Sequence, residues 1–211
     1  MRMLVRAAAL LVAAPVAAVL APAPLMAQAA TPVQQQQASA FITSLAEDAF
    51  AVLRDTGLTK TAARTKFREL LRANFALDET GLRLIRKWRA PTSPIKLTDA
   101  QLTAYRTALP TFLVNTYSDR LYDFASAKVT AVRTAPRGTR GEVDVYSRIS
   151  DPKGGKPIDA IWTVKMGGPK PLVANLTVNG VNVALTQEAD FNAFVEQNGF
   201  DALIAFMKKS G

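Results

Sequence analysis

The sequence predicts an α+β domain in which helices are layered on one face of a twisted, roughly four-stranded antiparallel sheet. Three observations predict this class. Apolar residues recur about every 3.6 positions through the first half of the chain, then every second position after residue 125, and two helical segments follow. Strands with a single apolar face need a cover, and the flanking helices are the cover available.

The first two helices are recognised by their apolar faces and their ends. Residues 30–38, with a run of four glutamines, are expected to form a flexible tail, so the first helix should begin near Ser39. It should end through a glycine C-cap at Gly57. The second helix is expected from about Thr61 to Phe75.

Two further helices should precede the sheet. A short one is expected over residues 78–88. Thr98 and Gln101 have the spacing of a capping box, so a longer helix should begin there and continue to about Phe124. Pro110 lies inside that helix and lacks the N–H that would bond to the preceding turn, which predicts a kink or break.

Alternating apolar residues predict the strands. The first begins at Val129, and residues 142–149, 158–166 and 172–178 form the next three. Asn179-Gly180 is a strong hairpin signal, although the short segment after it is equally consistent with a bulge or bend. Two helices near residues 188–198 and 201–209 should close the chain.

The first 29 residues have the pattern of a cleaved secretory signal peptide. Residues 1–6 form a short cationic start that contains Arg2 and Arg6. Residues 7–20 form an apolar run that is too short to cross a hydrocarbon core of about 30 Å. Ala27-Gln28-Ala29 provides the small-x-small cleavage pattern. We therefore expect a periplasmic protein with no transmembrane span in its mature form and one domain over residues 39–211. An uncleaved membrane anchor is the alternative.

The charge of the chain indicates what kind of partner it could bind. Two of the 26 basic residues and none of the 17 acidic residues lie in the first 29, which leaves the remainder at +7. Because the protein is expected to be exported, nucleic acid is disfavoured as a target for this positive charge. Anionic lipid surfaces or acidic proteins are the favoured partners. Arg64, Arg68 and Arg72 form a row along the second helix, which is either a solvated face or a docking surface.

The chain contains no cysteine and no histidine. These absences exclude disulfides, the Ser-His-Asp triad and most zinc sites. Acidic residues are scattered without the spacing of a calcium loop, so we expect neither a metal nor a catalytic residue. Carboxylate-only or Ser-Lys catalysis would still be possible, but no local signature indicates either. The composition therefore favours non-covalent binding over an enzyme.

Several segments, in order, resemble the MlaC family of periplasmic phospholipid-binding proteins, also described under toluene tolerance. Three lie in the helical half, and the others lie in the strands and the last helices. The resemblance covers nearly the whole mature chain. The segments are residues 67–72, 85–89, 113–121, 157–164, 178–181, 185–191 and 198–204.

The chain departs from the family pattern at four places. Glu188 stands where the family usually has arginine, and Asn175 stands where it typically has aspartate. Pro169-Lys-Pro171 replaces a tryptophan that is common before that strand, and Pro110 interrupts a usually smooth helix. These departures indicate a divergent branch, and hopanoid metabolism is one setting in which related proteins are encoded.

The resemblance implies an auxiliary component of a lipid ABC transport system that supports outer-membrane lipid asymmetry. The ligand would be a phospholipid or a related diacyl or hopanoid lipid, with no cofactor, and the protein would act as a monomer. It would pass this lipid between an outer-membrane complex and an inner-membrane ABC transporter with its ring protein. The three arginines of the second helix would dock these partners.

The resemblance also places the acyl chains in a pocket between helices and sheet. Eleven apolar or aromatic residues are expected to line it. They are Leu84, Trp88, Leu109, Phe112, Leu113, Tyr117, Leu121, Val145, Trp162, Val164 and Leu176. For each residue taken singly, ordinary core packing is the alternative, and only the resemblance favours a pocket.

Two other functions are compatible with the residues. One is a periplasmic chaperone or assembly factor that binds polypeptide through the basic helical face. The other is a small hydrolase that uses carboxylates alone.

Overall fold

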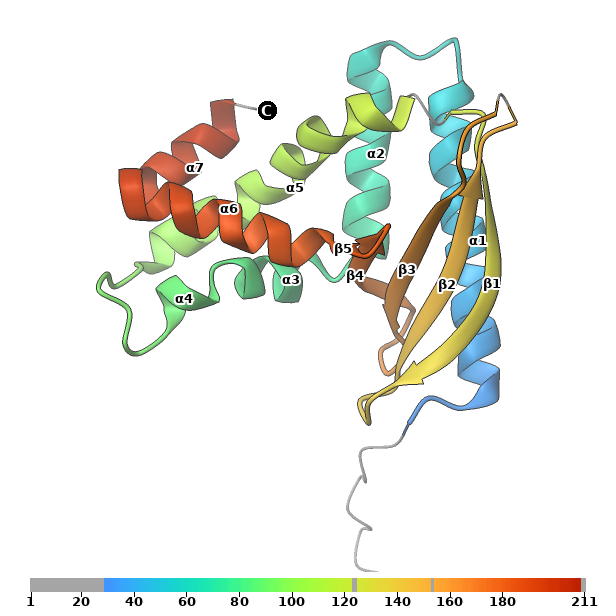
Figure 1. Ribbon diagram of the computed structural model, residues 1–211. Coiled ribbons are helices and arrows are strands. Elements are labelled where there is room, and N and C mark those ends of the chain that lie inside the picture. The colour runs from blue at the N-terminus through green and yellow to red at the C-terminus, as the bar shows by residue number, and fades with distance from the viewer. Residues whose placement is uncertain (1–28, 123–124, 153, 210–211) are drawn as a thin grey trace, which may run out of the picture.

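Helix α1 (Pro32–Arg54) and an antiparallel sheet form one half of the molecule, and a group of helices forms the other half (Figure 1). The computed structural model describes residues 29–122, 125–152 and 154–209, and in residues 118–122 only the backbone is described. Helix α2 (Lys60–Asn74) packs against both α1 and the helical half. The α+β class and the layering of helices on the sheet are confirmed.

The sheet has one more strand than expected, and its strands are hydrogen-bonded in the order in which they occur along the chain. All neighbouring pairs are antiparallel. The fifth strand contains only two residues, so the expectation of roughly four strands is met. The strands are β1 (Lys128–Arg137), β2 (Glu142–Ser150), β3 (Ile158–Lys165), β4 (Leu172–Val178) and β5 (Val181–Asn182).

The hairpin between β4 and β5 follows from its two turn residues. Asn179 and Gly180 have φ values of 47° and 81°, and positive φ at both positions is what a tight type I′ turn requires. The short strand ends because Asn182 caps helix α6 (Val183–Asn198), its side chain accepting a bond from the Leu185 N–H. The helix therefore begins five residues before the expected position.

We call the sheet face that α1 covers the inner face. The alternation of β2 is confirmed, since Val143 and Val145 lie on this face and are fully buried. They pack with valines of β3 and β4 against Ile42 and Leu45 of α1. Polar residues of the same strands occupy the opposite, outer face, where Arg133 stacks on the ring of Tyr146.

The helical half has a core of its own. It contains α3 (Leu77–Leu84), α4 (Arg86–Arg89), α5 (Asp99–Tyr122), α6 and α7 (Phe200–Lys209). Aromatic rings from three of these helices meet at its centre, with centroids of Tyr105 and Phe112 lying 6.2 and 5.6 Å from that of Phe191. The Tyr105 hydroxyl donates to the Gly81 carbonyl at 2.9 Å. Burial raises the pKa of this phenol well above its ordinary range.

The segment expected to be a flexible tail is instead largely helical. Helix α1 starts at Pro32, where a capping box forms: the Gln34 N–H donates to the Thr31 hydroxyl, and the Thr31 N–H donates to the Gln34 side chain. Glutamine is a good helix former, and Ala38 is completely buried in the core beneath α1. The polar run therefore occupies the solvent side of an anchored helix.

The capping box at Thr98 is confirmed, because its hydroxyl accepts from the Gln101 N–H at 3.2 Å. Helix α5 continues through Pro110 as one element, since Leu109 and Phe112 on either side are held in the helical core. The expected short helix is divided at Ile85 into α3 and α4. The expected end at Phe124 and residues 1–28 of the signal segment lie outside the described residues.

Among the described residues, we find no helix with the length and apolar character needed to cross a membrane.

Candidate functional site

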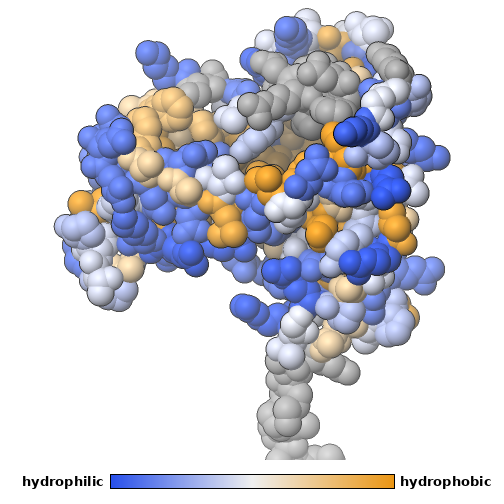
Figure 2. All heavy atoms as spheres, viewed as in Figure 1, coloured by the Kyte–Doolittle hydropathy of each residue, from blue (hydrophilic) through white to orange (hydrophobic). Residues whose placement is uncertain are grey.

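The inner face of the sheet is covered unevenly. Helix α1 lies closest to β1 and β2 and also covers Val164 of β3, while α3 and α6 contact β4. Trp162 of β3 and Leu176 of β4, which are paired directly on the inner face, are only partly buried. Figure 2 shows the surface hollowed between the helical half and the sheet, with apolar residues at the rim. We call this hollow the interlobe cleft.

The Trp162 ring is held in place by a hydrogen bond within the sheet. Its indole N–H donates to the Ser147 hydroxyl at 2.9 Å, and Ser147 is the inner-face neighbour on β2. Because the only polar atom of the indole is bonded, the rest of the ring presents an apolar surface. An apolar side chain of fixed orientation suits contact with a hydrocarbon ligand.

A polar pair joins α5 and α6, two helices that both reach the sheet: a valine of α5 packs in one cluster with a valine of β1, and α6 contacts β4. The Tyr117 hydroxyl of α5 donates to Oε1 of Gln187 on α6 at 3.2 Å. Gln187 is only 6% exposed, and Tyr117 is partly buried. We assign this pair to the helical side of the interlobe cleft, and Trp162 and Leu176 to its sheet side, because α6 contacts β4. Sequence analysis did not identify Gln187, because a single polar residue in a helical pattern gives no sign of its burial.

The eleven residues expected to line a pocket are distributed over three places. Four are in the helical core, each at most 5% exposed, and Leu113 packs against that core. Two are fully buried beneath α1. Three lie at the interlobe cleft, and the side chain of Leu121 is outside the described residues. The core group is Leu84, Trp88, Leu109 and Phe112; the pair beneath α1 is Val145 and Val164; the cleft group is Tyr117, Trp162 and Leu176.

Two shallow grooves also open on the surface. One, of about 380 Å³, runs between α1 and β1 beside Gln35 and Val132. The other, of about 230 Å³, lies beside Trp88 and Leu102. Pockets for drug-sized ligands enclose about 300–1,000 Å³, and a diacyl lipid is larger than such a ligand. Neither groove could therefore enclose two acyl chains.

The three arginines of α2 are not equivalent. Arg72 is exposed, whereas Arg64 and Arg68 are partly buried and their Nε atoms are enclosed. The difference arises because α2 packs against α5 as well as α1, so part of the arginine row lies against a neighbouring helix. Periodicity alone could not reveal this second contact.

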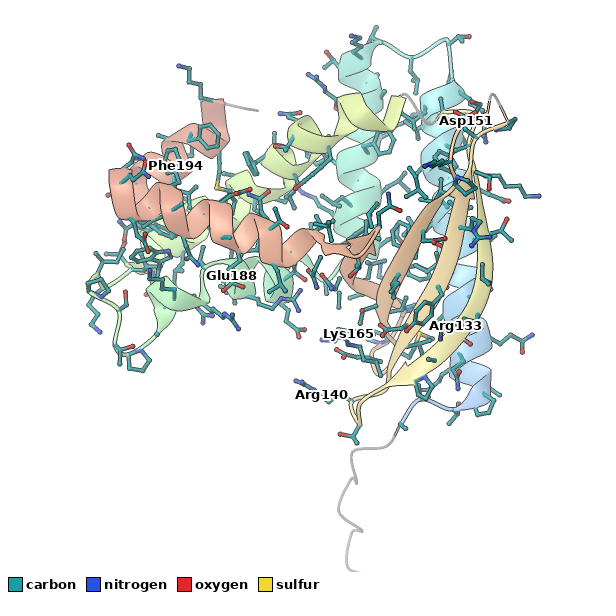
Figure 3. The ribbon with its side chains drawn as sticks, viewed as in Figure 1. Arg133, Arg140, Asp151, Lys165, Glu188 and Phe194 are labelled. Carbon is teal, nitrogen blue, oxygen red and sulfur yellow. The ribbon has the colours of Figure 1, made fainter. Side chains whose placement is uncertain are left out.

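Two buried carboxylates are each paired with an arginine. Glu188 on α6, 7% exposed, lies close to α3 and α4, and its Oε1 accepts from Nε of Arg86 at 2.6 Å (Figure 3). Asp144 on the outer sheet face accepts from Arg137 at 2.9 Å and from the Thr163 hydroxyl at 2.7 Å. The negative charge at position 188, a departure from the family pattern, is therefore matched by a nearby cation.

The described residues contain no group of three or more ligand side chains that could hold a metal ion. The four described side chains assigned to the cleft include no nucleophile with an adjacent base, which covalent catalysis would need. What the cleft offers is an apolar surface beside one polar hydrogen-bonding pair. Such an arrangement can bind an amphipathic molecule without reacting with it.

Comparisons with known proteins agree with the resemblance. The model of the MlaC protein family matches residues 43–209. No curated protein matches the chain. Among solved structures, a phospholipid-binding protein from Ralstonia solanacearum, determined in complex with a phospholipid, shares the fold with a TM-score of 0.67. The two are 16% identical, and the match covers 82% of this chain and 96% of that one.

Proposed function

Because the chain belongs to the MlaC family, we propose that it binds a diacyl phospholipid, or a related hopanoid lipid, in the interlobe cleft. It would carry this lipid through the periplasm between an outer-membrane complex and an inner-membrane ABC transporter with its ring protein. The observation that supports this most directly is the partly buried Trp162–Leu176 pair. Nearby inner-face valines of the same sheet are completely or almost completely buried.

The energetics explain why such a carrier is needed. Each buried methylene contributes about 0.8 kcal/mol, so two chains of ~15 methylenes each disfavour water by roughly 24 kcal/mol. Free diffusion of the lipid between membranes is therefore negligible. A cleft about as apolar as a bilayer makes transfer nearly isoenergetic, and docking at each membrane complex can then decide the direction.

The packing supports the cleft over the helical core as the place for the acyl chains. Leu109 and Phe112 are 2% and 5% exposed and lie in contact with buried aromatic rings. An acyl chain could reach these two side chains only by separating aromatic rings that stabilise the helical half. The inner face at Trp162 needs no such rearrangement, because this side chain is only partly buried.

The remaining parts of the proposal concern export and chemistry. Residues 1–29 would serve as a signal peptide, and the lipid-binding domain would include the whole of α1. Lipid transfer by docking requires no covalent step, so the protein would act without a catalytic residue or a cofactor. Arg72, the exposed arginine of its row, is the best placed of the three to contact an acidic partner.

Native mass spectrometry followed by organic extraction tests the proposal. Protein purified without detergent should carry about one diacyl lipid per chain, and mild delipidation should yield apoprotein that recovers lipid from vesicles. A preparation that contains no lipid and takes up none from vesicles would contradict the proposed function.

A further inference from the structure

We propose that Gln187, oriented by Tyr117, forms a polar subsite that binds an ester carbonyl of the lipid. This inference rests on the proposed function and names the residue that recognises the junction between the head group and the acyl chains. It is drawn from the hydrogen-bonding state of one buried amide.

The Gln187 side chain uses only part of its hydrogen-bonding capacity. A glutamine amide has two N–H donors and an oxygen with two lone pairs. Its oxygen accepts from the Tyr117 hydroxyl, but its N–H groups have no partner among the residues that the structure describes. Buried polar groups are bonded in the great majority of cases, because an unbonded one is costly. A side chain that is 6% exposed and keeps two donors unused within the protein can offer them to water or to a ligand.

The unused donors can be reached from outside the protein. Five side-chain atoms in the described residues are both enclosed and unbonded, and they belong to Arg64, Arg68, Trp88, Asn175 and Asn192. The amide nitrogen of Gln187 is not one of them, so it retains contact with accessible space.

The position of Gln187 places these donors at the edge of the helical core. Ala184 and Phe191, three residues before and four residues after it on α6, both contact that core. Gln187 is near the start of the helix, which contacts β4 next to the cleft. The amide thus lies on the stretch of α6 between the helical core and β4, the strand that carries Leu176. In such surroundings a single hydrogen bond can fix the position of a ligand.

The chemistry of the pair indicates what it binds. Both side chains are neutral, and a phosphate would instead be expected to bind arginine or lysine. An ester carbonyl is a neutral acceptor, and in a diacyl lipid it lies where the polar head group meets the acyl chains. With a carbonyl bound to Gln187, the chains extend over Trp162 and the head group remains towards solvent.

A competition between ester and ether lipids tests this inference. Delipidated protein is incubated with vesicles containing equal amounts of dipalmitoyl phosphatidylglycerol and its dihexadecyl ether analogue, and the bound ratio is read by native mass spectrometry. The ether lacks the carbonyl but keeps the head group and a similar chain. We expect the wild-type protein to prefer the ester about fivefold, as one neutral hydrogen bond would give.

Three variants distinguish a specific bond from general packing. Gln187→Leu should lower the ester preference to about 1:1 while lipid remains bound, and Tyr117→Phe should lower it partially. Gln197→Leu, the same change at an exposed site of α6, should keep the fivefold preference. Gln187→Met provides a second test if the leucine variant fails to fold. A wild-type ratio of 1:1, or an unchanged preference in Gln187→Leu, would overturn the inference, whereas binding of neither lipid would overturn the proposed function itself.

Discussion

The helical core and the interlobe cleft use similar residues with different results. Each contains one of the two tryptophans of the chain, with leucines beside it. Trp88 is 4% exposed within the helical core, whereas Trp162 is partly buried on the inner face of the sheet. The two indole rings differ in exposure because other side chains of the helical core enclose Trp88, whereas Trp162 is enclosed less completely. Residue type therefore does not distinguish a structural apolar side chain from one that is available to a ligand.

The contrast originates in the C-terminal helices. Helices α6 and α7 supply Phe191 and Phe200, and these rings fill the space around Tyr105. On the inner face of β3, α1 buries Val164 completely but leaves Trp162 only partly buried. The protein itself closes the helical core, whereas it leaves the inner face at Trp162 partly open.

The largest effect is expected in the helical core. Phe191→Ala removes a ring that is 2% exposed and should lower the free energy of unfolding by about 3–5 kcal/mol. Urea denaturation followed by circular dichroism measures this change. Phe206→Ala is the matched control, since Phe206 is 42% exposed on α7 and should cost about 1 kcal/mol or less. Equal losses from the two variants would show that the helical core is not packed as described.

The next prediction concerns the cleft. Leu176→Gln places an amide on the inner face and should lower lipid affinity about tenfold, because burying an unbonded amide costs about 1–3 kcal/mol. Stability should change little, since Leu176 is only partly buried. Lipid uptake from vesicles measures the affinity. Leu185→Gln, at a residue 56% exposed, provides the control and should bind lipid like the wild type. If Leu176→Gln bound lipid with the wild-type affinity, Leu176 of β4 would not line the binding site.

The buried phenol of the helical core predicts a pH dependence of stability. Burial raises the pKa of Tyr105, so the folded protein keeps this proton at a pH where the unfolded chain, with a tyrosine pKa of about 10, loses it. The contribution of Tyr105 to the free energy of unfolding is therefore complete below about pH 10, and above that pH it falls by ~1.4 kcal/mol per pH unit.

Comparison with Tyr105→Phe isolates this effect. At pH 8 the variant should be less stable by about 1 kcal/mol, because the Gly81 carbonyl loses its donor. The difference in the free energy of unfolding between the wild type and Tyr105→Phe should narrow and then reverse as the pH rises above 10. Urea denaturation at several pH values measures it. A constant difference between pH 8 and 11 would mean that the hydroxyl is accessible to water.

The smallest effect is expected at the hairpin beside the cleft. Gly180→Ala forces a positive φ on alanine and should cost about 1 kcal/mol. Gly167→Ala is a suitable control, because Gly167 is not in the left-handed region and an added Cβ would meet no atom closer than 4.0 Å. Thermal unfolding measures both. A loss in Gly167→Ala as large as that in Gly180→Ala would argue against the backbone explanation.

Local patterns predicted most of the fold. The period-two segments became β1 to β4, and Thr98 and Asn179-Gly180 formed the expected cap and turn. The segment over residues 30–38 was wrongly expected to be flexible, since its glutamines give no indication that Ala38 is buried. Pro110 did not break its helix because the long-range packing of Leu109 and Phe112 outweighs the lost hydrogen bond.

The candidate site was predicted less completely, for a physical reason. Trp162, Leu176 and Tyr117 were identified together with residues such as Leu109 and Val145, which have the same apolar spacing. Periodicity shows which face of an element is apolar, but the distance between packed elements depends on contacts far apart in sequence. Only the three-dimensional arrangement separates the residues that face the cleft from those that fill a core.

The central claim is that acyl chains lie against Trp162 and not inside the helical core. Fluorescence quenching by phospholipids with brominated acyl chains tests this claim directly in two single-tryptophan variants. Trp88→Phe, which retains Trp162, should be strongly quenched when the lipid binds, and Trp162→Phe, which retains Trp88, should be quenched little. Strong quenching of Trp88 with none of Trp162 would contradict the account and place the chains within the helical half.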